Sequence, residues 1–339
     1  MKTAIKKLVS TTQKSFDLDF LIRLSGQHLI LPFYHAVSDE DLIHLKHLYP
    51  VISTSRFEKD LDFLQQNYNA VSHNYLIDNK FSTTLRSKRA FFLSFDDGLR
   101  QFYDVVAPIL LRKGIPATFF VNTGFIDNKD MFYRLKISIL IEKVLKTELT
   151  PGQLSYIVEY FRKYNLEYKQ ASDFLLITYN SKELADLIAP VLDIDFKEYL
   201  AKHQPYLSTE QIKKLVDQGF SLGAHSVSHP YFPALSLSEQ IDETLSSIRF
   251  LTDNFNLKER LFSFPYTDFE VSKSFFDAIR NDVDIAFGTA NLKLDSVKSN
   301  LQRIPMEIKG SASAASIIKN EYLFFILKMF ISRHVITRK

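Results

Sequence analysis

Short, nearly unbroken apolar runs alternate along the chain with segments in which apolar residues recur every three or four positions. The first pattern is typical of strands buried in a parallel sheet, and the second of helices that cover such a sheet. The alternation predicts an α/β fold with a mainly parallel sheet and right-handed crossovers. The expected strands are residues 29–35, 90–95, 117–122, 220–224, 261–264, 284–288 and 301–304, and the expected helices are residues 55–67, 104–113, 208–218 and 236–254.

Residues 128–206 interrupt this rhythm. They carry helical periodicities at 135–145, 154–164 and 181–192 and few strand signals. We interpret the segment as a helical insertion within a single domain that spans residues 1–339. The sequence leaves open whether the insertion covers a substrate groove, contacts a membrane, mediates dimerisation or only enlarges the scaffold, and it leaves the oligomeric state open as well.

Two short motifs at the ends of expected strands carry the candidate chemistry. Asp96 and Asp97 follow the second strand, and His225 and His229 follow the fourth. Taken singly, each motif has a commoner explanation, as a turn or as a pair of packed or surface histidines. Together they fit a divalent metal site, because histidines at i and i+4 can face one ion while a carboxylate completes the set and leaves room for water. The other aspartate could accept a proton from that water, so the pattern indicates a metal-dependent hydrolase.

Both motifs resemble those of a known family. Ser94-Phe95-Asp96-Asp97-Gly98 is similar to the (T/S)-F-D-D-G signature of the polysaccharide deacetylases (carbohydrate esterase family 4), and His225-Ser226-Val227-Ser228-His229 to their H-(S/T)-x-x-H signature. The resemblance covers about residues 29–126 and 206–306. It implies an incomplete, distorted (β/α) barrel in which Asp96 is the general base. It also implies that Asp97, His225 and His229 bind zinc, cobalt or nickel, and that Ser226 supports their loop by a hydrogen bond.

The chain departs from the family pattern at two other motifs. Phe264-Pro265-Tyr266 resembles the third motif, which implies that the backbone N–H of Tyr266 helps to hold the oxyanion. However, Ser263 stands where the family has an arginine that orients the base. Leu301-Gln302-Arg303 also lacks the histidine that protonates the departing amine. The general acid is therefore unassigned, with His35 as the candidate and a merely packed histidine as the alternative.

Further polar residues follow the motifs. We expect Asp268, Glu270 and Arg303 to contact substrate, although Asp268 and Glu270 could instead cap the next helix. The i,i+3 spacing of His44 and His47 permits a second metal site or a polar surface toward the sugar, whereas the alternative is a solvated loop or helix face.

Composition limits the possible partners, and the targeting signals of the chain indicate its compartment. The 339 residues carry 42 basic and 39 acidic side chains, and this near balance gives no case for nucleic acid. Cysteine is absent, which excludes disulfides and thiolate ligands. The basic start of the chain lacks the apolar core of a signal peptide, and no run approaches the ~18 apolar residues of a membrane span. We therefore expect a cytoplasmic protein whose apolar and basic C-terminal helix, residues 312–339, packs on the domain or docks on the inner membrane face.

These observations predict a metal-dependent N-deacetylase acting on N-acetylhexosamine residues of a cell-surface polysaccharide or its precursor. One alternative is a catalytically weak or inactive glycan-binding relative, which Ser263 and the missing histidine favour. The other is a metal-dependent hydrolase of a different non-peptide C–N or ester bond.

Overall fold

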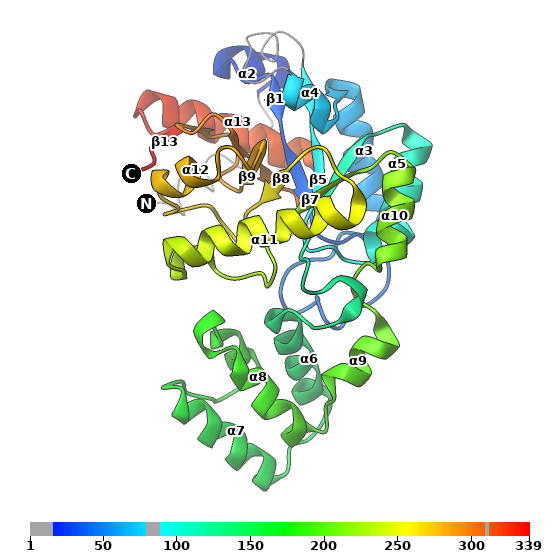
Figure 1. The fold of residues 1–339 in the computed structure, drawn as a ribbon, viewed down its shortest axis with the longest axis vertical. Coiled ribbons are helices and arrows are strands. Elements are labelled where there is room, and N and C mark those ends of the chain that lie inside the picture. The colour runs from blue at the N-terminus through cyan, green and yellow to red at the C-terminus, as the bar shows by residue number, and fades with distance from the viewer. Residues whose placement is uncertain (1–15, 79–88, 309–311) are drawn as a thin grey trace.

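The computed structural model describes residues 16–78, 89–308 and 312–339, and in this part eight short parallel strands curve into a barrel (Figure 1). Their order around the barrel is β11-β9-β8-β7-β6-β5-β2-β12. The strands are β2 (Pro32–Tyr34), β5 (Leu93–Phe95), β6 (Ala117–Val121), β7 (Ser221–Ala224), β8 (Leu261–Ser263), β9 (Ile285–Gly288), β11 (Asn300–Gln302) and β12 (Ile304–Pro305).

The chain itself links the two edges of this sheet. β11 pairs with β9 at one edge and β12 pairs with β2 at the other, yet only Arg303 separates β11 from β12 in sequence. The expected strand 301–304 is therefore divided at Arg303, and each part pairs with a different neighbour. This arrangement nearly closes the ring and confirms the expected (β/α) barrel.

Two smaller sheets adjoin the barrel. The expected first and second strands are each divided, so that β1 (Leu29–Ile30) and β4 (Ala90–Phe91) pair in parallel with each other, and β4 also pairs with β3 (Asn69–Ala70). Near the carboxyl end of the chain, β10 (Leu294–Asp295) pairs in parallel with β13 (Val335–Ile336).

Helices cover the outside of the barrel, and several begin at the predicted residues. Ser208 with Gln211 and Ser236 with Glu239 form capping boxes that open α10 and α11. A π-helical turn, Phe102–Val106, leads into α5, which ends at Gly114 in the left-handed conformation that glycine adopts readily. The helices of this layer are α2 (Leu18–Ser25), α3 (Thr54–Asn67), α4 (His73–Asp78), α5 (Ala107–Lys113), α10 (Thr209–Asp217), α11 (Leu237–Phe255), α12 (Lys273–Ile279) and α13 (Ala314–Phe330).

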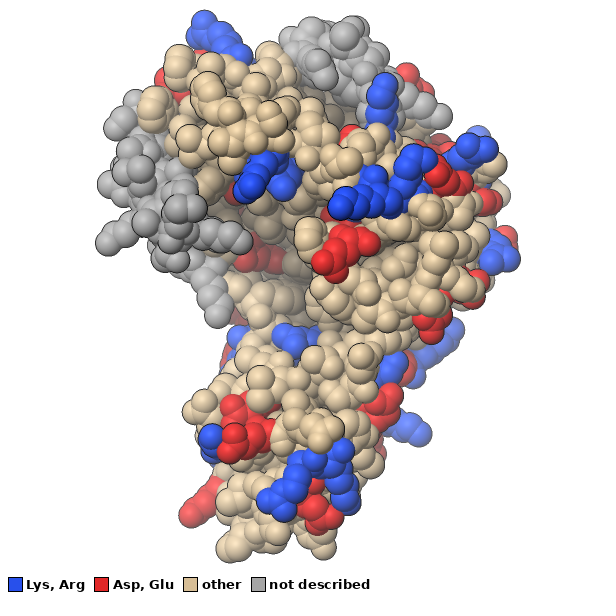
Figure 2. Space-filling view, turned by 90° about the vertical axis from the view of Figure 1, so that its left-hand side faces the viewer, with Lys and Arg blue, Asp and Glu red and all other residues tan. Residues whose placement is uncertain are grey.

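The segment between β6 and α10 forms a helical lobe below the barrel in Figure 1. Its buried side chains form a core that continues into barrel loops at Leu45 and Leu99. Figure 2 shows that charged residues of both signs are interspersed on the face it presents. The helices of the lobe are α6 (Tyr133–Lys146), α7 (Pro151–Lys163), α8 (Glu183–Ile188) and α9 (Phe196–His203), with 3₁₀ turns at Ile126–Asn128, Ala171–Leu176, Tyr179–Ser181 and Ala189–Leu192.

The histidines at 44 and 47 belong to the contact between the lobe and the barrel. His44 is buried and its Nδ1 lies 3.0 Å from the Tyr199 hydroxyl of α9. His47 Nε2 lies 2.8 Å from Glu142 Oε2 of α6. Neither residue lines the site described below, so the structure differs both from a second metal site and from a solvated surface.

The C-terminal segment packs along the barrel. α13 buries Ile318, Tyr322 and Phe325 against α2 and α3, whereas Phe330 in its last turn is 80% exposed. Among the described helices, none combines the length and the apolar character that crossing a membrane requires. After α13 the chain runs to β13, and Arg338 is buried again.

Candidate active site

The carboxyl ends of neighbouring strands deliver the site residues to one end of the barrel. Asp96 and Asp97 follow β5, His225 follows β7, and His35 follows β2. Ser263 is the last residue of β8. This is the end at which (β/α) barrels place their chemistry, because the loops there vary while the strands hold them in register.

Asp97, His225 and His229 form a compact buried cluster. Asp97 Oδ1 lies 3.4 Å from His225 Nε2 and 3.2 Å from His229 Nε2. In the part of the chain that the structure describes, they are the one group of three such residues whose ligand atoms lie within 4.8 Å of one another. His225 donates from Nδ1 to the Ser263 carbonyl at 2.8 Å, which leaves Nε2 with its lone pair directed to the cluster.

The cluster fits a divalent metal ion. Asp97 Oδ1 is buried, yet no described residue offers it a hydrogen bond. Burial alone would raise the pKa of Asp97, but the adjacent imidazoles of His225 and His229 outweigh burial and hold the pKa well below its ordinary value. A charged, unpartnered carboxylate oxygen beside two imidazoles is the donor set that zinc and similar ions prefer.

The loop that carries both histidines is tied down by hydrogen bonds. Ser226 Oγ accepts from the His229 backbone N–H at 3.0 Å, in keeping with its predicted supporting role. Glu243 of α11 accepts from the backbone N–H groups of Val227 at 2.8 Å and Ser228 at 3.0 Å. Ser226 and His229 have φ values of 68° and 56°, an unfavourable region that surrounding contacts must enforce. The loop is therefore rigid where it presents the two imidazoles.

Arg303 supplies the partner that Asp96 lacks at position 263. Its Nη1 donates to Asp96 Oδ1 at 2.8 Å and its Nη2 to Asp96 Oδ2 at 2.7 Å, a bidentate pair with both residues buried. Nη2 also donates to Ser263 Oγ at 2.6 Å. The guanidinium is fully buried, so Arg303 differs from the substrate contact that the sequence predicted. Arg303 instead orients the carboxylate of Asp96, the expected base, and stabilises its ionised form.

The surroundings of Arg303 fix the direction of this pair. The guanidinium carbon lies 4.3 Å from the centre of the Phe33 ring, and Nη1 also donates to Ser94 Oγ at 3.1 Å. Burial alone would raise the pKa of Asp96, but the charge and hydrogen bonds of Arg303, together with the neighbouring imidazoles, outweigh burial and the pKa lies below its ordinary value. Asp96 is consequently ionised at neutral pH, as an acceptor of protons must be.

His35 is paired with Glu307, a residue that the sequence analysis did not single out. The Glu307 carboxylate accepts from the backbone N–H groups of His35 at 2.8 Å and Ala36 at 2.9 Å, and it contacts His35 Nδ1 directly. Burial alone would lower the pKa of His35, but the charge of Glu307 and the hydrogen bond to it raise the pKa to about 9. The imidazole is therefore protonated at neutral pH, with its other nitrogen unused by the described residues.

Tyr266 lies opposite His229 with a free backbone N–H. Its φ is 57°, its ring centre is 4.8 Å from that of His229, and its hydroxyl donates to the Tyr133 hydroxyl at 3.1 Å. No described group accepts a hydrogen bond from the Tyr266 amide. Thr289 Oγ1 donates to the Tyr266 carbonyl at 3.1 Å, which holds this peptide in place.

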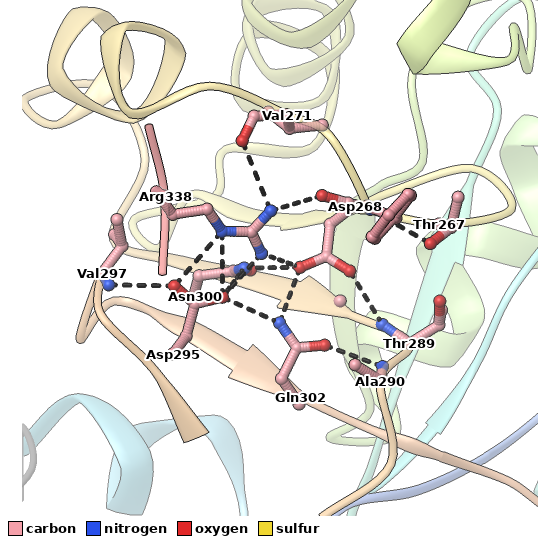
Figure 3. A network of polar contacts seen from close by, with 12 residues as sticks. Thr267, Asp268, Val271, Thr289, Ala290, Asp295, Val297, Asn300, Gln302 and Arg338 are labelled. Atoms are coloured by element: carbon pink, nitrogen blue, oxygen red, sulfur yellow. Dashed lines mark hydrogen bonds and ion pairs between the residues drawn. The ribbon is translucent and has the colours of Figure 1, made fainter. Parts of the chain in front are cut away.

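Asp268 lies outside the pocket and anchors the loop that follows Tyr266. It is 1% exposed, and its Oδ2 accepts from Asn300 at 2.8 Å and Gln302 at 2.6 Å and contacts the Arg338 guanidinium (Figure 3). Arg338 also binds Asp295 Oδ2 at 2.6 Å. The structure thus differs from the prediction that Asp268 lines the groove, because its carboxylate is paired with Arg338 of the C-terminal segment.

The site residues surround a pocket of about 300 Å³. Six of the predicted residues line it, whereas Asp268, Glu270 and Arg303 do not, and Glu270 is exposed elsewhere. The sequence analysis did not predict Tyr49, whose hydroxyl lies 3.5 Å from Asp97 Oδ2. In the sequence, it is marked only by its position close to His44 and His47. The lining residues are Phe33, His35, Leu48, Tyr49, Asp96, Asp97, Phe132, Arg134, His225, His229, Phe264, Tyr266 and Thr289.

The barrel thus brings an ionised carboxylate and a protonated imidazole to one pocket, beside a candidate metal site. The sequence matches the polysaccharide deacetylase family over residues 84–281, more than half of the chain, and the protein belongs to that family. It is a hydrolase of carbon–nitrogen bonds other than peptide bonds. No curated protein sequence matches the chain.

Solved structures share the fold. A Streptococcus pyogenes deacetylase, PplD, in complex with acetate has a TM-score of 0.56 at 16% identity, covering 86% of this chain and 97% of its own. IcaB from Ammonifex degensii has a TM-score of 0.54 at 17% identity, covering 87% and 98%. A de-N-acetylase from Aggregatibacter actinomycetemcomitans has a TM-score of 0.51 at 16% identity, covering 86% and 99%. At these identities the likeness concerns the fold.

Proposed function

We propose that this protein is a metal-dependent N-deacetylase that removes acetyl groups from N-acetylhexosamine residues of a cell-surface polysaccharide or its precursor. The observation that carries the proposal is the buried Arg303–Asp96 pair set directly beside the Asp97, His225 and His229 cluster. It combines an ionised, oriented proton acceptor with a candidate site for an ion, and a glycan-binding relative without activity needs neither.

Each group has a role in the hydrolysis of an acetamide. An ion held by Asp97, His225 and His229 would supply Lewis acidity that brings the pKa of a bound water toward 7. Asp96 accepts a proton from the attacking water as its oxygen bonds to the acetyl carbon. The Tyr266 N–H donates to the oxygen on which negative charge develops.

His35 completes the reaction as the general acid. It gives a proton to the amide nitrogen as the C–N bond breaks, so that acetate and a free amine leave. Glu307 keeps the imidazole protonated before this step and stabilises its orientation. His35 therefore replaces the histidine that is missing near residue 303.

Two measurements test the proposal. Purified protein should contain about one equivalent of zinc, cobalt or nickel by elemental mass spectrometry, and His229→Ala should lose it. The metal-loaded protein should release acetate from oligomers of N-acetylglucosamine, whereas Asp96→Asn should keep the metal and lose turnover about 10²–10⁴-fold. A protein that takes up no ion from excess metal would contradict the proposal, and release of acetate from O-acetyl sugars alone would move it to the ester-hydrolase alternative.

A further inference from the structure

A second hollow of about 500 Å³ lies between the helical lobe and the barrel. The lobe contributes one wall and two loops of the barrel contribute the other. Its lining residues are Tyr133, Arg134, Leu175, Ile177, Thr178, Tyr179 and Asn180 from the lobe, and Tyr231, Ala234 and Tyr266 from the barrel.

The hollow is continuous with the catalytic pocket. Arg134 and Tyr266 line both spaces. The hydroxyl of Tyr266 donates to that of Tyr133 at 3.1 Å, so the boundary between the two spaces is a pair of touching tyrosines. A chain molecule with one unit at the candidate metal site therefore has room to extend into the hollow.

Aromatic rings run from the metal site across the hollow. Tyr266 lies 4.8 Å from His229 and 5.9 Å from Tyr231, centre to centre, while Tyr133 lies 6.5 Å from Tyr179. Tyr231 and Tyr266 are 40% and 39% exposed. Exposed tyrosines present an apolar face with a hydroxyl at the edge. A pyranose ring matches them, because it has C–H groups on its faces and hydroxyls around its rim.

Arg134 gives the lining of the hollow a positive charge, and no acidic side chain of that lining balances it. Arg134 is partly buried, and no described residue forms a hydrogen bond or ion pair with its guanidinium. The lining residues, all within the described ranges, include no Asp or Glu. The free donors of Arg134 suit the hydroxyl and acetamido oxygens of a neutral sugar, whereas they repel an ammonium group.

We propose that this hollow is a subsite for the sugar next to the one that is deacetylated, and that it selects a neighbour whose amine is still acetylated. The inference rests on the proposed function and deepens it. Because the reaction creates an amine that is charged at neutral pH, each turnover makes the adjacent position a poorer substrate. The helical lobe thus biases the enzyme against consecutive deacetylation along a glycan.

Binding measured without turnover tests the subsite. Asp96→Asn protein incubated with Zn²⁺ is titrated by calorimetry with the N-acetylglucosamine monomer and with its tetramers in β-1,4 and β-1,6 linkage. We expect at least one tetramer to bind more tightly than the monomer. Adding Tyr179→Ala or Tyr231→Ala should weaken that tetramer about tenfold more than the monomer. Tyr156→Ala is the matched control, because Tyr156 is an exposed tyrosine of α7 that does not line the hollow.

The preference for an acetylated neighbour has its own comparison. A tetramer carrying one glucosamine should bind on the order of tenfold more weakly than the fully acetylated tetramer, and Arg134→Gln should reduce that ratio toward one. Circular dichroism and thermal melting of each variant serve as the control for correct folding.

The outcomes separate the two proposals. The subsite is overturned if no tetramer binds more tightly than the monomer, or if the tyrosine variants and the Tyr156→Ala control behave alike. If the wild-type protein releases no acetate while tetramer binding still depends on Tyr179 and Tyr231, the catalytic proposal fails and the subsite stands. If the wild-type protein releases acetate but the tyrosine variants bind every probe as well as before, the subsite fails alone.

Discussion

Replacing Arg303 with methionine should inactivate the enzyme while leaving the candidate metal site intact. Methionine keeps much of the side-chain volume between Phe33 and Asp96 but removes the charge and both hydrogen bonds to the carboxylate. Among the described residues, Asp96 would then keep Ser263 as its one side-chain hydrogen-bond donor, at 3.3 Å. Without the guanidinium, burial is opposed less strongly and the pKa of Asp96 rises, so the carboxylate becomes a poorer proton acceptor.

The magnitude follows from the burial of the pair. Arg303 is fully buried and Asp96 is 2% exposed, so water cannot replace the lost bonds. Breaking one side of such a pair costs about 3–5 kcal/mol of folding free energy. Loss of the base should lower kcat about 10²–10⁴-fold. Arg303→Lys should recover part of the stability and less of the activity, because an ammonium group cannot bind both oxygens in the same plane.

The assay combines denaturant unfolding, kcat on an N-acetylated oligomer and metal content for the same preparations. Metal content should stay unchanged, since Arg303 does not contact Asp97, His225 or His229. The exchange Ser263→Arg with Arg303→Ser restores a guanidinium to the space that Arg303 leaves, because Ser263 Oγ lies 2.6 Å from its Nη2. Activity of Arg303→Met within a factor of about five of the wild type would refute the assignment of Arg303 as the partner of the base.

Three further predictions follow from individual contacts. Glu307→Gln should lower kcat on acetamides about 10²-fold but affect activated esters far less, because a good leaving group needs no proton from His35; equal losses on both would contradict the acid role. Arg338→Ala should lower kcat and increase proteolysis near Asp268 while metal content is retained, and Arg338→Lys should be intermediate; unchanged kcat would show that the anchor is unrelated to Tyr266. For Glu142, burial would raise the pKa, but hydrogen bonds from Lys146, Lys46 and His47 outweigh it and lower the pKa to about 2. Since the folded pKa is depressed, this stability is complete above the unfolded pKa near 4.5 and is lost as pH falls toward 2, so unfolding of Glu142→Gln should depend less steeply on pH in that window.

The sequence was informative where local patterns decide the structure. The expected helices 208–218 and 236–254 begin where α10 and α11 do, because at each start a serine and the side chain three positions later satisfy the first backbone N–H groups without help from the fold. The carboxylate and histidine motifs likewise depend on strand ends that are visible in the apolar pattern. The motifs predicted two histidines with one carboxylate, and the family resemblance singled out Asp97, which the structure places beside His225 and His229.

The errors arose where the chain closes on itself. Arg303 reaches Asp96 only because β11 and β12 join the two edges of the barrel, and no spacing in the sequence reports that closure. Asp268 forms an ion pair with Arg338, 70 residues later in the sequence, and His35 is paired with Glu307, 272 residues later. Each partner is an ordinary charged residue outside any motif, so its role becomes visible only when distant segments are placed together.

The position of the helical lobe, in contrast, follows from topology once the barrel is accepted. The chain leaves the carboxyl end of β6 and returns to the amino end of β7, its neighbour in the sheet. α10 alone provides the covering helix of this crossover. The remaining residues between β6 and α10 must therefore project from the carboxyl ends of the strands, which is the face that carries Asp97 and His225. An insertion at this point lies beside the reacting group by necessity, whereas one after the helix would lie at the opposite end of the barrel. This placement is why Arg134, in the first turn of α6, reaches the pocket of the candidate active site and Tyr133 the adjoining hollow. It is also why changes in the lobe should alter substrate choice without altering the chemistry.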